Sequence, residues 1–515
     1  MDLTCTEKYS MSLVRKIIRN VFANWFAHAV TIVVAFFLMP FIIRQLGDND
    51  YGIWILAFSL TGHLGVLDLG LRPIIVRYVA KYSALKDDQK INEVINSTLA
   101  AFTIIGVAVL LVSIVLSLLS SRLFNVPPES YSDLRIVIIL AGINLAMTFP
   151  FGVFNATIAA FQRFDLSSVI KISMYLTRSL FIVIFLSSGG GLITLGIIYV
   201  STHLVEYLWR LKLCYRIYPE LKISLTYANR KTLKMVTSFG IYGFIIALST
   251  QIAYQSDSIV IGAFISAGAI TYFAIGSNLI QYLQNIVSLL NTTLTPVASS
   301  LEAQQEFGLL KKLLIVGTRY CALIVLPIAT TYIVLGQEFI RLWIGPEYAP
   351  SSSRVLTILT IAYIGYLSQF IVGAIFYGLG KVKVFAIGSI AAALANLALS
   401  LLLVKPYGIY GVAWGTTIPL ALYTYGVQPI YICHLLKVKY LDYFRMSYLT
   451  PILAMIPFTL IIIAIERYIQ LDSLPEFGVY IVSASLVFAL ISFRFAVEPD
   501  HRKAVIQKIK QATGR

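Results

Sequence analysis

The chain has 515 residues, of which 58% are hydrophobic and 12% are charged, and its mean hydropathy is +0.82. Soluble domains carry about 25% charged residues, so this composition excludes a soluble globular enzyme and predicts a multi-pass membrane protein. The net charge of +16 would suit a nucleic-acid binder if the basic residues shared a polar surface. They lie instead between apolar runs, where the anionic cytoplasmic leaflet is the expected partner.

Apolar runs long enough to cross a bilayer follow one another along the chain. A helix is expected in each, because backbone groups in lipid must be hydrogen-bonded internally. We therefore predict an all-α polytopic membrane protein of about fourteen transmembrane helices. They span residues 20–43, 51–73, 94–120, 135–160, 168–187, 191–214, 235–263, 269–296, 313–336, 355–378, 383–404, 408–436, 447–465 and 476–497.

The basic residues predict the orientation in the membrane. The N-terminus, the even-numbered loops and the C-terminus hold 32 of the 40 Lys and Arg, the odd-numbered loops hold 7, and Arg178 lies inside the fifth helix. The positive-inside rule then places both termini on the cytoplasmic side of the inner membrane. We predict an N-terminal lobe (1–217), a cytoplasmic linker (218–234), a C-terminal lobe (235–440), and two further helices with a basic tail (441–515).

Two halves of the chain resemble each other. FQRFDLSSVIKISMYL in the first half resembles GLGKVKVFAIGSIAAAL in the second, and Gly191 matches Gly408 at a spacing of 217 residues. Tyr51 and Tyr272 correspond in a second pair of segments. Six helices separate the matches, which predicts two six-helix lobes related by a pseudo-two-fold axis along the membrane normal. The alternative is chance similarity between Leu/Ile/Gly-rich helices.

Polar residues gather on single faces of some predicted helices. Spacings of three and four place those of the eighth helix on one face, and Asn24 and His28 in the first helix have similar spacing. A wet cavity between two lobes would explain these faces; the alternative is that small polar residues join neighbouring helices. The residues of the eighth helix are Asn278, Gln281, Gln284, Asn285, Ser288, Asn291, Thr292 and Thr295.

Charges inside the spans cost about 2.5–3.5 kcal/mol each unless they are paired or hydrated. Arg178 could attract a phosphate group or pair with an acid. Asp257 has no basic residue within four positions, which makes it the candidate for cation or proton coupling. Two further pairs have the four-residue spacing of a local ion pair: Asp68 with Arg72, and Glu206 with Arg210.

Several kinds of chemistry have no motif in the chain. There is no GxxxxGK[ST], no GxSxG and no HExxH, and the four cysteines form no CxxC pair. We therefore expect no ATPase, no catalytic domain, no metal site and no cofactor.

The segment LMPFIIRQLGDNDYGIWILAFSLTGHLGVLDLGLRPIIVRYVAKY resembles the opening of the polysaccharide (O-antigen type) flippases. These belong to the multidrug/oligosaccharidyl-lipid/polysaccharide exporter superfamily. AAFQRFD, SFGIYGF and DSIVIGAFISAGAITYFAIGSNL follow in the order expected of that family. The resemblance covers nearly the whole chain in helix count and in the order of these segments.

This resemblance implies a transporter rather than an enzyme. It would move polyprenyl-pyrophosphate-linked oligosaccharide to the outer leaflet by ion-gradient-driven alternating access, for surface polysaccharide synthesis. The expected partners are this substrate, membrane lipids, and the polysaccharide polymerase and chain-length machinery, with no nucleic acid. By position, the cavity-facing residues would be Asp68, Arg72, Arg178 and Asp257. The substrate contacts would be completed by Asn24, His28, Gln281, Gln284, Asn285, Ser288 and Asn291.

Other functions fit the same composition. A drug or cation antiporter of the same superfamily would share the fold and the coupling scheme. A polytopic polymerase or ligase acting on lipid-linked sugars usually needs a large outward loop, and no predicted outward loop exceeds about twenty residues. A channel is a further alternative, although two repeated lobes favour alternating access.

Overall fold

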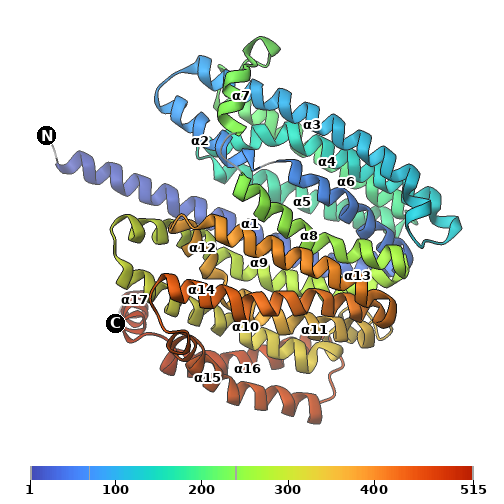
Figure 1. Cartoon of the computed structure of the whole chain (residues 1–515), viewed down its shortest axis with the longest axis vertical. Helices are drawn as coiled ribbons and strands as arrows, with labels where there is room; N and C mark the ends of the chain where they lie inside the picture. The colour runs from blue at the N-terminus through green and yellow to red at the C-terminus, as the bar shows by residue number, and fades with distance from the viewer. Residues whose placement is uncertain (1–2, 69, 238–240, 513–515) are drawn as a thin grey trace. The chain divides into compact units, whose positions relative to one another are not determined.

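Most of the chain that the structure describes is helical. The computed structural model describes the backbone of residues 3–68, 70–237 and 241–512, and the side chains of these residues except 3–24, 235–237, 241–243, 289–293, 509, 511 and 512. Every regular element in these ranges is helical (Figure 1). Eleven helical stretches among them are long and apolar enough to cross a membrane. The prediction of an all-helical, multi-pass membrane protein is therefore confirmed.

In their described residues, the fourteen predicted segments are almost entirely helical. The long helices are α1 (Leu3–Leu64), α3 (Asp88–Leu123), α4 (Tyr131–Ala160), α5 (Phe164–Ser187), α6 (Leu192–Ile217), α8 (Ile241–Phe264), α9 (Ala267–Ala303), α10 (Phe307–Trp343), α11 (Ala349–Ser368), α13 (Val382–Ala421), α15 (Tyr440–Tyr468) and α16 (Leu474–Phe495). Shorter helical elements are η1 (Gly65–Asp68), α2 (Leu71–Ala84), η2 (Pro128–Ser130), η3 (Leu225–Tyr227), α7 (Arg230–Thr237), α12 (Phe370–Gly378), the π-helix η4 (Leu422–Val427), α14 (Gln428–Leu435) and α17 (Pro499–Ala512).

Two glycines divide the longest helices. Gly47 in α1 has φ 81° and ψ 171°, and Gly408 in α13 has φ 59° and ψ −139°. These are backbone conformations that a residue with a Cβ rarely adopts. The first predicted helix and most of the second therefore lie in α1 on either side of Gly47, and α13 continues from the eleventh predicted helix into the twelfth.

Six helices end in the same way, with the second residue after the helix in the left-handed conformation. The backbone N–H of the next residue then donates to a carbonyl five residues back, as from Val438 to Cys433 at 2.8 Å and from Asp87 to Tyr82 at 3.0 Å. The left-handed residues are Lys86, Gln162, Gly189, Gln305, Gly380 and Lys437. Lys86 and Gln305 are 219 residues apart and Gln162 and Gly380 are 218 apart. The helix ends thus repeat at nearly the spacing found in the sequence.

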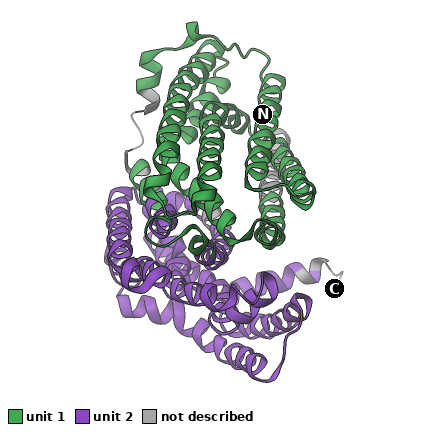
Figure 2. Ribbon diagram, turned by 90° about the vertical axis from the view of Figure 1, so that its right-hand side faces the viewer, with its two compact units in different colours: residues 1–251, 262–271 green, residues 252–261, 272–515 purple. Residues whose placement is uncertain are grey.

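The chain divides into two compact units (Figure 2). Unit 1 comprises residues 1–251 and 262–271, and unit 2 comprises residues 252–261 and 272–515. In unit 1, α3 packs on α4, α4 on α6, and α1 on α5. Small residues permit this approach, since a Cβ on Gly142 would lie 2.4 Å from the Cβ of Ser113. The domain boundaries expected at residues 217, 234 and 440 stay predictions.

The predicted linker is held on α3 within unit 1. Asn92 accepts from the backbone N–H of Lys222 at 2.7 Å, and Asn96 donates to the carbonyl of Lys222 at 2.7 Å. Asn96 also accepts from the N–H of Ser224 at 2.9 Å. At the start of this stretch, burial and a hydrogen bond to Asp88 raise the pKa of the Tyr218 hydroxyl, so it stays protonated and donates. Two asparagines on one helix face therefore satisfy the backbone of an otherwise irregular segment.

In unit 2, α10 packs against α15, which in turn packs against α16. Phe458 and Ile462 of α15 lie in the same buried cluster as Phe488 of α16. Arg319 of α10 joins these helices to the chain end, since it donates to the carbonyl of Met446 at 2.7 Å and to Glu498 at 2.9 Å. The last two long helices are thus packed parts of unit 2.

We predict that Gly47→Ala and Gly408→Ala each destabilise the protein by about 1–3 kcal/mol, because alanine is strained at these φ values. Gly478→Ala is the matched control. Gly478 lies inside α16 with nothing within 4 Å of its would-be Cβ, and its φ is not positive. Alanine there should be neutral or slightly stabilising. Thermal unfolding in detergent measures all three, and equal midpoints would contradict the assignment of strain.

Candidate functional site

A cluster of charged side chains lies between α5 and α6 in unit 1. Arg210 donates to Glu206 at 2.7 Å, and Arg178 lies 3.7 Å from the other oxygen of the same carboxylate. Both arginine side chains are 8% exposed and Glu206 is 15% exposed. Two arginines therefore share one buried acid, which leaves one positive charge in excess. The predicted Glu206–Arg210 pair is confirmed, and Arg178 is paired with an acid as well.

Neutral groups satisfy the remaining donors of these arginines. Arg210 donates to Asn155 at 2.6 Å and to Ser167 at 2.7 Å. Arg178 donates to Thr202 at 2.8 Å, and its guanidinium carbon lies 4.9 Å from the centroid of the Tyr199 ring. The ring face attracts the cation without neutralising it. The excess charge is thus held in place by hydrogen bonds and an aromatic face.

Further basic groups surround this cluster. Half-buried Lys171 of α5 interacts electrostatically with Arg210 and Glu206. Lys171 also interacts electrostatically with His28, an exposed residue of α1. The four charged groups Lys171, Arg178, Glu206 and Arg210 sum to two positive charges. The side chain of Asn24, predicted beside His28, lies outside the described residues and stays a prediction.

A second ion pair occurs where α2 begins. Arg72 donates to Asp68 at 3.1 Å, as their spacing predicts, with exposed fractions of 36% and 25%. The same guanidinium reaches the carbonyl of Thr148 at 3.4 Å. The Thr148 hydroxyl contacts the Tyr207 hydroxyl at 2.8 Å. Tyr207 stacks on His203, which is hydrogen-bonded to Asn144. Polar contacts therefore extend from α2 through α4 to α6.

In unit 2, the side chain of Asp257 is buried among neutral groups. Asp257 of α8 is 4% exposed and accepts from the Thr416 hydroxyl of α13 at 2.8 Å. Asn396 donates to the same hydroxyl at 3.0 Å, and Ser400 is a further neutral neighbour. The Oδ1 atoms of Asp257 and Asn396 are both buried and have no hydrogen-bond partner among the described residues. Buried oxygens without donors favour a ligand that supplies positive charge.

The polar residues of α9 fall into two groups, which differ in their exposure. Gln284 is half-buried and accepts a hydrogen bond from Tyr254 of α8. Gln281 and Asn285 are exposed, and Ser288 beside them donates to the carbonyl of Asn285 at 2.8 Å. The side chain of Asn291 lies outside the described residues. Gln281 and Asn285 therefore present amides that a ligand could contact, whereas Gln284 is engaged within unit 2.

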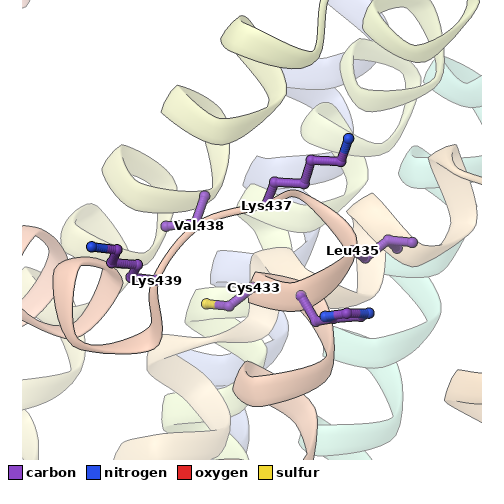
Figure 3. Close-up of a pocket in the computed structure, with 6 residues that line it drawn as sticks. Cys433, Leu435, Lys437, Val438 and Lys439 are labelled. Carbon is purple, nitrogen blue, oxygen red and sulfur yellow. The ribbon is translucent and has the colours of Figure 1, made fainter.

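The turn between α14 and α15 borders an open surface pocket of about 500 Å³ (Figure 3). Lys437 and Lys439 project from the turn in different directions in this view. The basic groups therefore do not converge on one point. The pocket is lined by Cys433, His434, Leu435, Lys437, Val438 and Lys439.

Sequence reasoning missed the polar residues that connect helices. Thr202, Asn155 and Ser167 satisfy the buried arginines, yet each is an ordinary helix residue in the sequence. The signal that could have revealed them is the need of each buried guanidinium for several acceptors. The contact of Asp257 with Thr416 spans 159 residues, which no local spacing predicts.

Comparisons with known proteins agree with this architecture. Residues 17–302 match the family described as polysaccharide biosynthesis protein. The chain is 22% identical over 423 residues to "Putative O-antigen transporter" of Shigella flexneri, covering 81% of this chain and 97% of that protein. It is also 22% identical over 510 residues to "Uncharacterized membrane protein EpsK" of Bacillus subtilis (strain 168), covering 96% and 98%.

Solved structures share the fold. The lipid II flippase MurJ in an inward closed conformation aligns with a TM-score of 0.71 at 16% identity, over 92% of this chain and 98% of that one. An inward-facing multidrug resistance transporter of the MATE family aligns with a TM-score of 0.68 at 15% identity, over 79% and 94%. The chain therefore has the two-lobe fold of these transporters.

We predict that Glu206→Gln destabilises the protein by about 3–5 kcal/mol, because it leaves two buried arginines without their acid. Glu338→Gln is the control: Glu338 pairs with Arg341 at 2.5 Å, but these side chains are 34% and 40% exposed. Breaking that pair should cost about 0–1 kcal/mol. Thermal unfolding of both purified variants provides the comparison, and similar midpoints would mean that the cluster is hydrated.

Proposed function

Because the chain belongs to the polysaccharide biosynthesis protein family, we propose that it moves polyprenyl-pyrophosphate-linked oligosaccharide from the cytoplasmic to the outer leaflet of the cytoplasmic membrane. The observation that carries this proposal is the excess of buried positive charge in unit 1. A diphosphate is the part of such a substrate that is most costly to bring into a low-dielectric interior. A preformed, partly uncompensated cationic cluster would offset that cost.

The basic residues divide into two roles in this proposal. Arg72 and Lys171 are accessible enough to touch the diphosphate. Arg178 is engaged with Glu206 and Thr202, so it sets the positive potential behind them. Asp68 holds the Arg72 guanidinium in place. His28 lies close enough to Lys171 for the two side chains to interact electrostatically.

The amides of α9 suit the sugar part of the substrate. An amide both donates and accepts, which matches the hydroxyl groups of a glycan. Gln281, Asn285 and Ser288 form the accessible face, and Gln284 supports it through Tyr254. Asn24 and Asn291 are retained as substrate contacts on their sequence positions.

We assign energy coupling to Asp257. Its carboxylate and the amide oxygen of Asn396 are hard oxygen ligands without donors, which suits a small monovalent cation. Binding and release of one charge there would couple the conformational equilibrium of the protein to an ion gradient. Both termini lie in the cytoplasm in this proposal, because 32 basic residues lie on their side. The polymerase and chain-length machinery would receive the product.

A drug or cation antiporter is the second candidate. The observation that favours it is the buried acid of Asp257, together with a fold shared with multidrug transporters. The excess positive charge of unit 1 argues against cationic drugs, which it would repel.

The deciding experiment is deletion of the gene in its host, with lipid-linked oligosaccharides quantified on each leaflet. We expect completed units to accumulate on the cytoplasmic leaflet and the intact protein to restore their export, but not when the ion gradients are dissipated. Normal distribution with altered sensitivity to cationic dyes would support the antiporter. Single units accumulating on the outer leaflet would instead indicate a defect in polymerisation.

We predict that the double substitution Gln281→Leu/Asn285→Leu reduces transport at least tenfold at normal expression, since buried sugar hydroxyls would lose their partners. Ser299→Ala is the control, because Ser299 is an exposed hydroxyl of α9 that donates to its own helix at Thr295. Both variants should unfold at the temperature of the unaltered protein. Full transport by the double variant would show that these amides of α9 do not contact the substrate.

A further inference from the structure

An open surface groove in unit 2 shares no residue with the clusters described above. Its volume is about 480 Å³, which is in the range of small-ligand sites. Residues of α10, α11 and α13 line it, and α11 lies between the other two because it packs against both. The groove is at the end of unit 2 where α10 ends, α11 begins and α13 turns at Gly408. The distribution of basic residues places this end on the outer side of the membrane.

The groove becomes more apolar with depth. Each of the three helices contributes two residues four positions apart, which is about 6 Å along a helix. In each case the more polar residue is nearer the outward end. The pairs are Gln337 above Ile333 in α10, Arg354 above Ile358 in α11, and Tyr410 above Trp414 in α13.

Arg354 supplies a positive charge at the polar end. Its guanidinium carbon lies 5.9 Å from the centroid of the Tyr410 ring on the neighbouring helix. This guanidinium forms no ion pair or hydrogen bond with any described residue. The nearby sequence position Glu338 does not neutralise it, because that carboxylate is paired with Arg341 at 2.5 Å. Arg354 therefore keeps its charge and its N–H donors available, while the ring face holds it in position.

The chemistry of the groove fits an amphiphile. A guanidinium can donate two parallel hydrogen bonds to a phosphate group, and the exposed amide of Gln337 adds another donor. Deeper in the groove, Ile333 and Trp414 are 44% and 40% exposed, so apolar surface is available to a hydrocarbon chain. Tyrosine and tryptophan are also typical of the level at which lipid headgroups lie.

We propose that this groove binds the anionic phosphate headgroup of a lipid in the outer leaflet. Arg354 holds the phosphate, and the hydrocarbon chain lies along Ile333 and Trp414. Two lipids carry this chemistry: an anionic phospholipid such as phosphatidylglycerol, and a polyprenyl diphosphate. The choice of leaflet rests on the orientation proposed above, whereas the binding itself does not depend on the transport function.

The test is photocrosslinking from inside the groove. The full chain carrying Trp414→p-benzoylphenylalanine is reconstituted into vesicles of phosphatidylcholine with minor amounts of phosphatidylglycerol and a polyprenyl diphosphate. Mass spectrometry then identifies the crosslinked lipids. We expect one of the anionic lipids to be enriched about tenfold over its share of the vesicle, as one charge-assisted contact would give. Arg354→Gln in the same chain should return the crosslinks to the vesicle composition.

Two matched controls separate this site from lipid that merely surrounds the protein. Leu402 lies six residues before Gly408 and Trp414 lies six residues after it, so both are about 9 Å along a helix from the turn. Leu402 is 71% exposed and does not line the groove. Leu402→p-benzoylphenylalanine should therefore crosslink lipids in proportion to their abundance. Arg122→Gln removes an exposed arginine from the last turn of α3 in unit 1, and it should leave the enrichment at position 414 unchanged.

Two results would overturn the inference: crosslinks at position 414 that follow the vesicle composition, as at position 402, or an enrichment that survives Arg354→Gln. Enrichment of phosphatidylglycerol would support the site and identify a membrane phospholipid as its ligand. Enrichment of the polyprenyl diphosphate would support it with a carrier lipid as the ligand. None of these readouts involves transport, so the leaflet distribution of lipid-linked oligosaccharide decides the proposed function separately.

Discussion

The structure depends on one constraint, which is that lipid offers neither hydrogen bonds nor counter-charges. Backbone groups in the membrane-spanning segments satisfy this constraint by forming helices. Charged side chains in the spans form ion pairs, as Arg178 and Arg210 do with Glu206. Further hydrogen bonds from these arginines are accepted by Asn155, Ser167 and Thr202. At Asp257 and Asn396, one oxygen of each side chain has no hydrogen-bond partner among the described residues.

The two units bury charged groups of opposite sign. Unit 1 retains net positive charge around Glu206, whereas unit 2 retains an acid with neutral partners. In the proposed function, the cationic cluster attracts the anionic lipid, and Asp257 is a separate site whose charge can change. The family to which the chain belongs is consistent with this division of labour.

The sequence predicted features that depend on local spacing and on hydropathy. The fourteen helical segments, the Asp68–Arg72 pair and the Glu206–Arg210 pair follow from apolar runs and from four-residue spacing. The third member of the cluster, Arg178, could not be assigned, because its partner depends on how α5 packs against α6. Similarly, spacing placed Gln284 on the polar face of α9, but only packing shows that Tyr254 engages it. The break at Gly47 lies between the predicted helices 20–43 and 51–73, but the backbone angles show that a single residue makes it.

The left-handed helix ends have a practical consequence for handling the protein. Lys86, Gln162, Gln305 and Lys437 each adopt a conformation that costs a side chain about 1 kcal/mol relative to glycine. They are distributed over four separate turns, and the effects of distant substitutions usually add. Replacing these four residues by glycine should therefore recover stability without touching the charged clusters.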